Sequence, residues 1–394
     1  MVDWLLLCHP RTIYSIHHLI LKASVTPEAI YDIEWYLMKR IDIPLFLSVI
    51  ILTLFGLFMI YDASSFIAFR DFKDKYSYIK DQSLWALLGL TGMMIFSYFD
   101  YKKFYLLALP ILISAIVMLI LVFIPGIGVY ALGANRWIDL GFIILQPAEY
   151  VKLSLAIYLA AWFATKEKER FLAFVLLIGF VFLLIMIQPD MGTASIILFE
   201  ALVLYFLSGA SIKNFLILTP GILLIGLILI KIAPYRAARL TSFLNTGHNL
   251  DGASYHVKQI LIALGSGGIF GVGVGNSLQK FAYLPENVTD SIFPIIAEEL
   301  GFIGSSLLVG MYAFIIWRGL YIATNAKDTF GKLLAGGIIS FIGIQVVINL
   351  AAMTASLPLT GVPLPYISYG GSALIIDMSA IGILLNISKQ SAHK

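Results

Sequence analysis

Uninterrupted apolar runs of about twenty residues recur along the chain and constrain its fold more than any other feature. A run of this length is what an α-helix needs to cross the hydrocarbon core of a bilayer. The strands of a membrane barrel would instead alternate polar and apolar residues over about ten positions. Hydrophobic residues make up 60% of the chain and charged residues 12%, so water cannot be the main solvent. We therefore predict an all-α integral membrane protein.

About ten segments are long and apolar enough to be expected to span the membrane as helices. They are residues 44–61, 82–99, 104–124, 146–164, 171–188, 192–208, 215–233, 291–317, 330–354 and 371–388. An even number of spans places both termini on one side. Basic residues occur in every short connection on that side, which identifies it as cytoplasmic. They are Lys39, Arg40, Lys102, Lys103, the KEKER run at 166–170, Lys213, Arg318, Lys327, Lys332 and Lys389.

The predicted organisation is a cytoplasmic extension at 1–40 followed by a polytopic transmembrane domain at 41–390. No basic segment with a cleavage site begins the chain, so the first span is expected to direct insertion. Three segments on the outer side, 62–81, 125–145 and 234–290, exceed the usual length of helix connections. Long loops on one face usually carry function, and 234–290 is the longest of the three.

The loop at 234–290 contains the glycine-rich sequence GSGGIFGVGVG at 265–275. Such glycine density is unfavourable in a lipid-exposed helix but suits a re-entrant or surface segment that approaches a ligand closely. A Walker-type phosphate loop is excluded because no Gly-Lys-Ser/Thr follows. We expect this segment to lie near a ligand.

Ionisable residues inside predicted spans are candidates for function. Glu149 and Lys152 are three residues apart in QPAEYVK and share one face of a helix. They could form a structural ion pair. Alternatively, Lys152 and Arg136 of the neighbouring GANRWIDLG segment could face an outer cavity and neutralise an anion, since Arg and Lys both suit phosphate oxygens. The spacing leaves both interpretations open.

Two further acids, Asp190 and Glu200, lie just before and within the sixth predicted span. Asp190 follows Gln188-Pro189 at a tight turn, where its carboxylate can cap the next helix, and we favour that role. Glu200 lies farther into the same helix and needs a partner that the sequence does not reveal.

Four carboxylates, from Glu286, Asp290, Glu298 and Glu299, surround the start of the eighth predicted span. Carboxylates gathered in a partly desolvated place should raise the pKa of at least one of them toward the range of a useful general base. Asp290 could serve as that base, or Thr289 or Asp290 could simply cap the helix. The spacing of these residues does not favour either role, general base or helix cap.

The sequence resembles the SEDS family (shape, elongation, division, sporulation), whose members are polytopic peptidoglycan glycosyltransferases. The resemblance covers residues 44–388. It is carried, in the family's order, by GANRWIDLG (133–141), QPAEYVK (146–152), QPDMGT (188–193), YRAARLTSFL (235–244), GSGGIFGVGVGNSLQKFAYLPENVTDSIF (265–293), EELGFIG (298–304) and GVPLPYISYGGS (361–372). The segment NSLQKFAYLPE looks more like the division type, FtsW, than the elongation type, RodA.

The resemblance implies ten spans and polymerisation of lipid II into glycan strands on the outer face of the bacterial cytoplasmic membrane. The family's catalytic carboxylate maps onto Asp290, and Arg136, Glu149 and Lys152 fall on functionally sensitive positions. The outer loop adds Arg236, Arg239 and Glu286. We expect these six residues to bind the substrate and its pyrophosphate. A divalent cation (Mg²⁺ or Mn²⁺) could share that work, although no ligand cluster requires one.

This sequence departs from the family pattern near the proposed base. Val288 stands where His is frequent, Ser291 replaces a common Phe, and Ala373 replaces a Ser. Val288 puts in doubt any role for a neighbouring imidazole.

The expected partners are lipid II, a class B penicillin-binding protein that supplies transpeptidation, and other proteins of the division machinery. The chain itself has no set of SxxK, SxN and KTG motifs for cross-linking. Its small net charge of +3 gives no reason to expect nucleic acid as a partner.

Three alternatives remain open. The chain could be an elongation-type polymerase, or a lipid II flippase or transporter without polymerase activity, because broken glycine-rich helices and intramembrane charges also describe carriers. It could also be a non-catalytic scaffold for a partner synthase.

Overall fold

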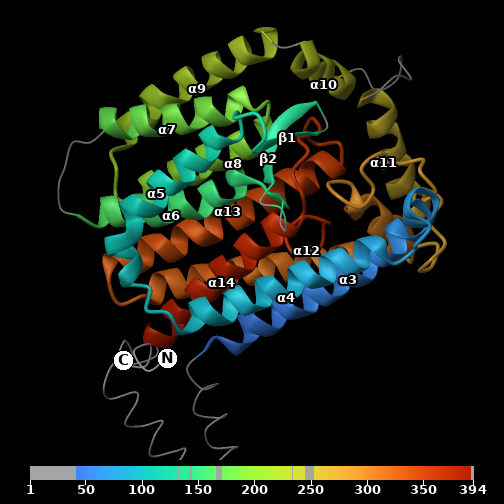
Figure 1. Ribbon diagram of the computed structural model, residues 1–394, viewed down its shortest axis with the longest axis horizontal. Helices are drawn as coiled ribbons and strands as arrows, with labels where there is room; N and C mark the ends of the chain where they lie inside the picture. Colours follow the sequence, from blue (N-terminus) through green and yellow to red (C-terminus); the bar gives the residue numbers. More distant parts are fainter. Residues whose placement is uncertain are drawn as a thin grey trace, which may run out of the picture.

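The computed structural model describes residues 41–391 except 132, 140, 142–143, 166–170, 233 and 245–252. The predicted extension at 1–40 and the basic run at 166–170 lie outside these residues. A long helix covers each of the ten predicted segments (Figure 1). Their bounds are α3 Ile43–Phe72, α4 Ser77–Tyr98, α5 Lys103–Leu121, α6 Pro147–Ala164, α7 Phe171–Ile187, α8 Met191–Leu207, α9 Ile212–Ile232, α12 Ile292–Asn325, α13 Thr329–Met353 and α14 Gly371–Ser391.

Six of the described helices, α3, α5, α9, α12, α13 and α14, are long and apolar enough to cross a membrane, and α7 and α8 are shorter apolar helices. The chain is therefore a multi-pass, helical membrane protein. The number of ten spans stays a prediction.

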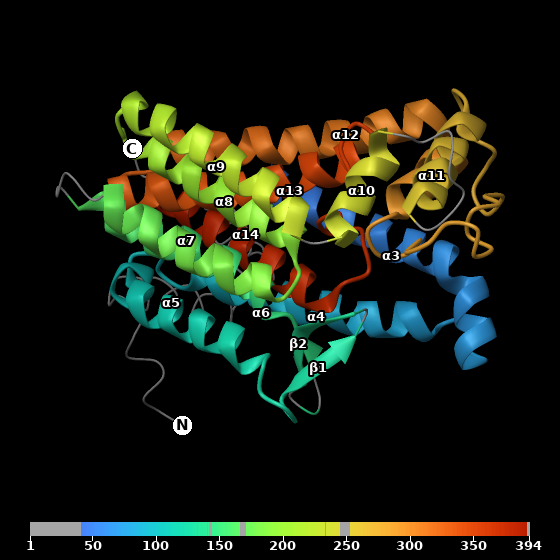
Figure 2. The same ribbon diagram turned by 90° about the horizontal axis from the view of Figure 1, so that it is seen from above.

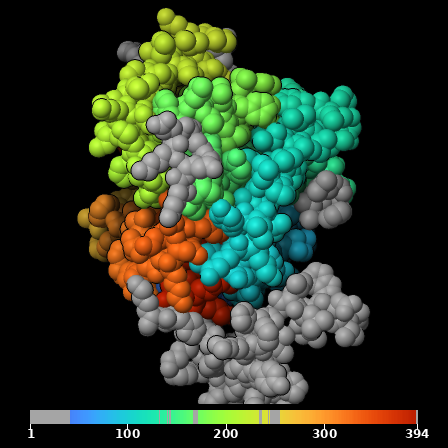
Figure 3. Space-filling model, turned by 90° about the vertical axis from the view of Figure 1, so that its left-hand side faces the viewer, coloured from blue at the N-terminus to red at the C-terminus, as the bar shows by residue number. Residues whose placement is uncertain are grey.

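The described chain begins and ends at the same end of the bundle. The backbone N–H of Asp42, before α3, donates to Ser388 Oγ of α14 at 3.3 Å. At this end the Tyr101 hydroxyl, between α4 and α5, donates to Asp328, which caps α13, at 3.0 Å. Figure 3 looks onto this end, where blue-green, green and orange segments lie together.

The centre of the bundle is formed by α6, α13 and α14, whose side chains are largely buried. Glycines let α14 approach α4 closely: a Cβ on Gly382 would lie 2.4 Å from the Met93 carbonyl oxygen. By contrast, α9 has no buried residue among those the structure describes, and it lies at the edge of the bundle (top of Figure 1).

Two predicted outer segments differ from expectation. The segment at 62–81 is not a long loop, because α3 continues to Phe72 and α4 starts at Ser77. The segment at 125–145 is not helical or irregular, because it contains a small antiparallel sheet of β1 Gly128–Ala131, β2 Ala134–Asp139 and β3 Ile144–Leu145 in the order β1-β2-β3. The fold is mostly helical, as predicted, and this small sheet is an addition that the sequence did not indicate.

The sheet forms because the segment supplies a hairpin turn. Gly133, in the turn between β1 and β2, has a φ of 79°, which glycine adopts without steric cost. Val129 pairs with Trp137, and Ile138 pairs with Leu145. Figures 1 and 2 show the hairpin at the end of the bundle that also carries the helices of the third outer segment, α10 Pro234–Leu244 and α11 Ala253–Gly267.

The glycine-rich segment supplies hydrogen bonds to backbone groups that a break in α12 leaves unpaired. Gly301 has φ 65° and ψ −165°, which interrupts the helix, and an interrupted helix in a membrane must satisfy its freed backbone groups internally. The N–H groups of Val272 and Gly273 donate to the carbonyls of Glu298 and Glu299 at 3.0 and 3.1 Å.

The glycines themselves allow this close contact. A Cβ on Gly271 would lie 2.0 Å from the Glu299 carbonyl oxygen. Gly267 and Gly271 thus serve backbone packing against α12, and the expected proximity of this segment to a ligand stays a prediction.

Candidate active site

A cavity of about 920 Å³ opens between the sheet, α4, α10 and the loop that precedes α12. Its lining is rich in carboxylates and aromatic rings, with two arginines. The side chains that carry charge or a ring are Asp81, Trp85, Arg136, Trp137, Asp139, Glu149, Asp190, Arg239, Glu286, Asp290 and Tyr369. Segments far apart in the chain therefore meet in one polar cavity at the end of an apolar bundle.

Asp290 lies at the wall of this cavity, two residues before α12 begins. The residue at the N-cap of α12 is Ser291, and its side chain makes no capping hydrogen bond. Among the described side chains, the Asp290 carboxylate receives one long contact, 3.4 Å from the Thr289 hydroxyl, beside its own backbone N–H. The structure therefore does not support the capping role for Asp290, and its carboxylate stays available to a ligand.

Burial changes the acidity of Asp290. Its side chain is 8% exposed, and loss of water, followed by the negative charge of Glu286, raises its pKa to about 7. The positive charge of Arg239 acts in the opposite direction. A carboxyl group with a pKa near neutrality is suited to general-base catalysis. Burial is the larger cause of this raised pKa, and of the other three grouped carboxylates only Glu286 contributes to it.

Other carboxylates of the cavity have structural partners. Asp190 accepts hydrogen bonds from the Thr193 backbone N–H at 3.0 Å and from the Thr193 hydroxyl at 2.9 Å, so its predicted role as the cap of α8 is confirmed. Asp139 accepts a hydrogen bond from the Gly141 N–H at 2.7 Å. Both carboxylates are therefore occupied by hydrogen bonds within the protein, unlike that of Asp290.

Glu149 and Lys152 form the predicted ion pair, with Lys152 Nζ 2.7 Å from Glu149 Oε2. Glu149 touches the cavity, but Lys152 is fully buried and also donates to Gln345. The structural interpretation of Lys152 is therefore favoured over direct contact with an anion. Glu200, also fully buried, has no hydrogen-bond partner for its carboxylate oxygens among the described residues.

Two arginines supply positive charge to the cavity. Arg136 on β2 donates to the carbonyls of Gln188 and Pro189 at 3.1 and 2.5 Å, and Arg239 on α10 donates to the Leu359 carbonyl at 3.0 Å. A guanidinium has five N–H donors, so these contacts fix each group and leave donors for a bound anion. Both residues line the cavity, and their binding of an anion stays a prediction.

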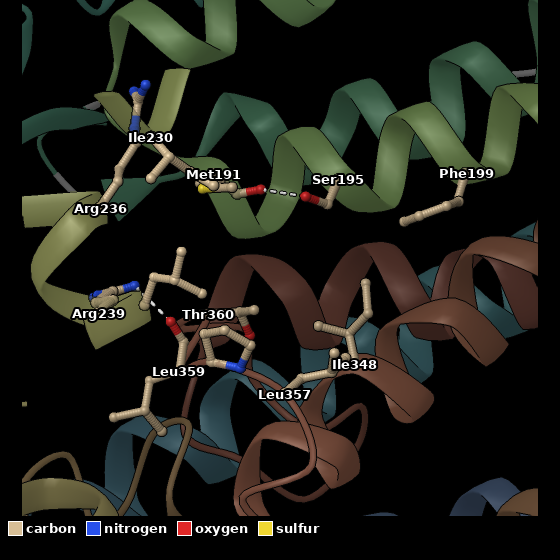
Figure 4. Close-up of a pocket in the computed structure, with 12 residues that line it drawn as sticks. Met191, Ser195, Phe199, Ile230, Arg236, Arg239, Ile348, Leu357, Leu359 and Thr360 are labelled. Atoms are coloured by element: carbon tan, nitrogen blue, oxygen red, sulfur yellow. Dashed lines mark hydrogen bonds between the residues drawn. The ribbon is translucent and has the colours of Figure 1, made fainter. Parts of the chain in front are cut away.

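Arg236 lies instead in a second, smaller pocket of about 190 Å³. Figure 4 shows Arg236 and Arg239 at one end of this pocket and the apolar side chains of Phe199, Ile348 and Leu357 at the other. Arg239 lines both cavities. The small, mostly apolar pocket and the polar cavity therefore share Arg239 in their walls.

Glu298 and Glu299 do not join Asp290 in the cavity. Glu298 accepts hydrogen bonds from the Ser277 hydroxyl and, at 3.2 Å, from the Ser266 hydroxyl. Glu299 pairs with Lys280 at 3.2 Å. The expected cluster of four carboxylates is thus two pairs: Glu286 and Asp290 face the cavity, and the other two hold the glycine-rich loop.

Several cavity residues were not singled out from the sequence. Trp85, Trp137 and Tyr369 place rings in its wall, and Asp81 an exposed carboxylate. Trp137 and Tyr369 lie inside the motifs GANRWIDLG and GVPLPYISYGGS, which could have indicated them. Nothing in the local sequence distinguishes Trp85 or Asp81 from ordinary residues at a helix end.

Within the described part of the chain, no group of three or more His, Cys, Asp or Glu residues is placed to hold a metal ion. The possible divalent cation therefore has no ligand set here, and we assign no catalytic step to it.

Comparisons with known proteins agree with this architecture. Residues 43–393 match the FTSW_RODA_SPOVE family, described as "Cell cycle protein". "Stage V sporulation protein E" of Bacillus subtilis is 40% identical over 362 residues, covering 89% of this chain and 98% of that protein. The "Probable peptidoglycan glycosyltransferase FtsW" of Geobacter sp. strain M18 is 37% identical over 364 residues, covering 89% and 98%.

Among solved structures, the chain is similar to one from the work "Structural coordination of polymerization and crosslinking by a peptidoglycan synthase complex". The two share 25% sequence identity and a TM-score of 0.75, and the match covers 90% of this chain and 99% of that chain.

Proposed function

This chain belongs to the FtsW/RodA/SpoVE family, and on that basis we propose that it polymerises lipid II into glycan strands, with Asp290 as general base. It is a peptidoglycan glycosyltransferase of the FtsW-like type, as its relatives of 36 to 40% identity named FtsW indicate. The observation that carries the catalytic assignment is Asp290: a buried, weakly bonded carboxylate with a pKa of about 7 in a cavity with two arginines.

In the proposed step, the Asp290 carboxylate removes the proton from the 4-hydroxyl of the acceptor sugar. That oxygen attacks the anomeric carbon of the donor, and the bond from this carbon to the pyrophosphate breaks with its electron pair on the departing oxygen. The configuration inverts from α to β. Asp290 ends the step protonated, which its raised pKa favours.

Arg136 and Arg239 would stabilise the departing pyrophosphate, the group on which negative charge accumulates. Their guanidinium groups are held by backbone carbonyls, so little reorganisation is needed when the charge develops. Glu149 would act indirectly, by pairing with Lys152 beneath the cavity. Glu286 would act on Asp290 through its charge.

The part of the lipid chain next to the pyrophosphate would enter the small apolar pocket beside Arg239, because Arg239 borders both spaces. This arrangement keeps the polyprenyl tail between helices while the sugar and pyrophosphate reach the polar cavity. It also gives a physical reason why the reaction occurs in a membrane bundle.

We also propose that the termini are cytoplasmic, that the cavity faces outward in the bacterial inner membrane, and that a class B penicillin-binding protein and division proteins are partners. The described basic connections containing Lys102, Lys213 and Lys327 support this orientation. The similarity to a peptidoglycan synthase complex that couples polymerisation to cross-linking supports a transpeptidase partner.

The test uses the purified full-length protein with lipid II, with and without its transpeptidase. Production of glycan strands by the parent and not by Asp290→Ala supports the proposal. Movement of lipid II across vesicles without any glycan would instead identify a flippase. Full biological function of Asp290→Ala in cells would point to a scaffold.

A further inference from the structure

The short segment 287–291 carries Asp290 and is held by contacts from several separate elements. The Asn287 amide donates to the Ala63 carbonyl of α3 at 3.3 Å. The backbone N–H of Tyr369, from the loop before α14, donates to the Val288 carbonyl at 2.8 Å. These two contacts fix the side of the segment that leads into Asp290.

The peptide of Asp290 itself is held from α13. The Asn349 side-chain amide donates to the Asp290 carbonyl at 2.9 Å and to the Val362 carbonyl at 2.7 Å. Asn349 is fully buried, so this contact has no competing water. It fixes the Asp290 backbone but not the direction of its carboxylate.

The next contact comes from α11. His256 Nε2 lies 2.7 Å from Ser291 Oγ, and Ser291 is fully buried. A serine at an N-cap commonly bonds to the third helical N–H, but the third residue of α12 is Pro294, which has no N–H. The hydroxyl is therefore turned to His256, and the two helices are joined one residue beyond Asp290.

His256 is the imidazole that the local sequence around Asp290 lacks. Burial and the nearby charge of Arg239 lower its pKa to about 4, so the ring is neutral at neutral pH and adds no positive charge beside Arg239. Arg239 acts electrostatically on both His256 and Asp290. The ring therefore lies within the same electrostatic environment as the proposed base.

We propose that His256, through its hydrogen bond to Ser291, is a positioning residue that keeps the Asp290 carboxylate turned into the cavity. It links the helices of the outer loop to the base without touching substrate. This inference rests on the proposed function of Asp290. Without the bond, the end of the segment can rotate and the carboxylate can turn toward water.

The experiment measures kcat, KM and the pH dependence of kcat for the purified full-length protein with lipid II. The variants are His256→Ala, Ser291→Ala and the double variant. We expect each single change to lower kcat about tenfold or more, since small misplacements of a reacting group have such effects, with KM changed less than about twofold. The double variant should be no slower than the slower single variant, because both remove one contact.

The pH profile separates positioning from simple stability. A carboxylate turned toward water loses the burial that raises its pKa, so the acid limb of kcat should move to lower pH in His256→Ala. His256→Gln, whose amide can still bond to Ser291, should restore most of kcat. Lys258→Ala, an exposed change on the same helix, should match the parent.

Several results would overturn the inference. One is an unchanged kcat in His256→Ala. Another is a lower melting temperature of His256→Ala without a shift in the acid limb of its kcat profile. A third is a double variant whose loss of kcat equals the product of the two single losses. If His256→Ala does not fold, Ser291→Ala, which removes one hydroxyl, decides by the same criteria. Asp290→Asn distinguishes the two proposals: parent-level activity there refutes the base, whereas an inactive Asp290→Asn with an unaffected His256→Ala refutes only the positioning role.

Discussion

Replacing Asp290 with Asn should stabilise the folded protein at alkaline pH while it removes activity. The carboxyl titrates near 7 in the folded protein instead of at its ordinary value of 3.8. Since one pH unit of pKa change corresponds to about 1.4 kcal/mol, the buried charge disfavours folding by about 4 kcal/mol once the group is ionised in both states. Asn keeps the shape and can still accept the contact from Thr289, but it carries no charge.

The sign depends on pH. A raised carboxyl pKa favours the folded state at low pH, and that advantage is lost as pH rises from about 4 to about 7. The gain from Asp290→Asn should therefore be near zero at pH 4 and complete at pH 8.

Thermal unfolding of the parent and of Asp290→Asn in detergent, at pH 4 and at pH 8, measures this gain in stability. The melting temperature should rise by several degrees at pH 8 only. Asp81→Asn, which neutralises an exposed carboxylate of the same cavity, should leave it unchanged. An equal or lower melting temperature for Asp290→Asn at pH 8 would refute the claim that Asp290 is buried with a raised pKa.

Three further predictions concern the pH profile, the buried ion pair and the broken helix. Polymerisation by the parent should fall about tenfold per pH unit below about 7 as Asp290 is protonated; initial rates that stay constant down to pH 5 would contradict this. Lys152→Ala should destabilise the protein by about 3 to 5 kcal/mol because it leaves Glu149 buried without its partner, and adding Glu149→Gln should recover much of the lost melting temperature. Gly301→Ala should cost about 3 kcal/mol or more, since its φ of 65° is strained for alanine and its Cβ would lie 2.3 Å from Gly271 N; an unchanged melting temperature would show that the loop does not pack there.

The helices could be predicted because their signals are local, whereas Asp290 was singled out by the motif that resembles the family. An apolar run of fixed length predicts a spanning helix whatever its neighbours are, and the outer loop could be recognised by its length. The ion pair of Glu149 and Lys152 and the cap made by Asp190 were also accessible, because each depends on residues three apart in the chain.

Features that depend on contacts between distant segments could not be predicted in this way. The sequence did not indicate that Gly267 and Gly271 pack against the backbone of α12, because only the fold brings α12 there. Likewise, Glu298 and Glu299 were grouped with Asp290 by sequence distance, although the helix turns them toward the loop. His256 meets Ser291 across 35 positions, and no local pattern indicates that pair.

The central claim, that Asp290 is the general base of glycan polymerisation, is tested most directly by one rate ratio. It compares the initial rate of glycan formation from lipid II at pH 8 for Asp290→Asn with that of the parent, both purified, folded and supplied with the same transpeptidase. The account predicts a loss of about 10³-fold, with Lys258→Ala unaffected. A folded Asp290→Asn that polymerises lipid II within about twofold of the parent rate would contradict it, since general-base catalysis typically contributes far more than that.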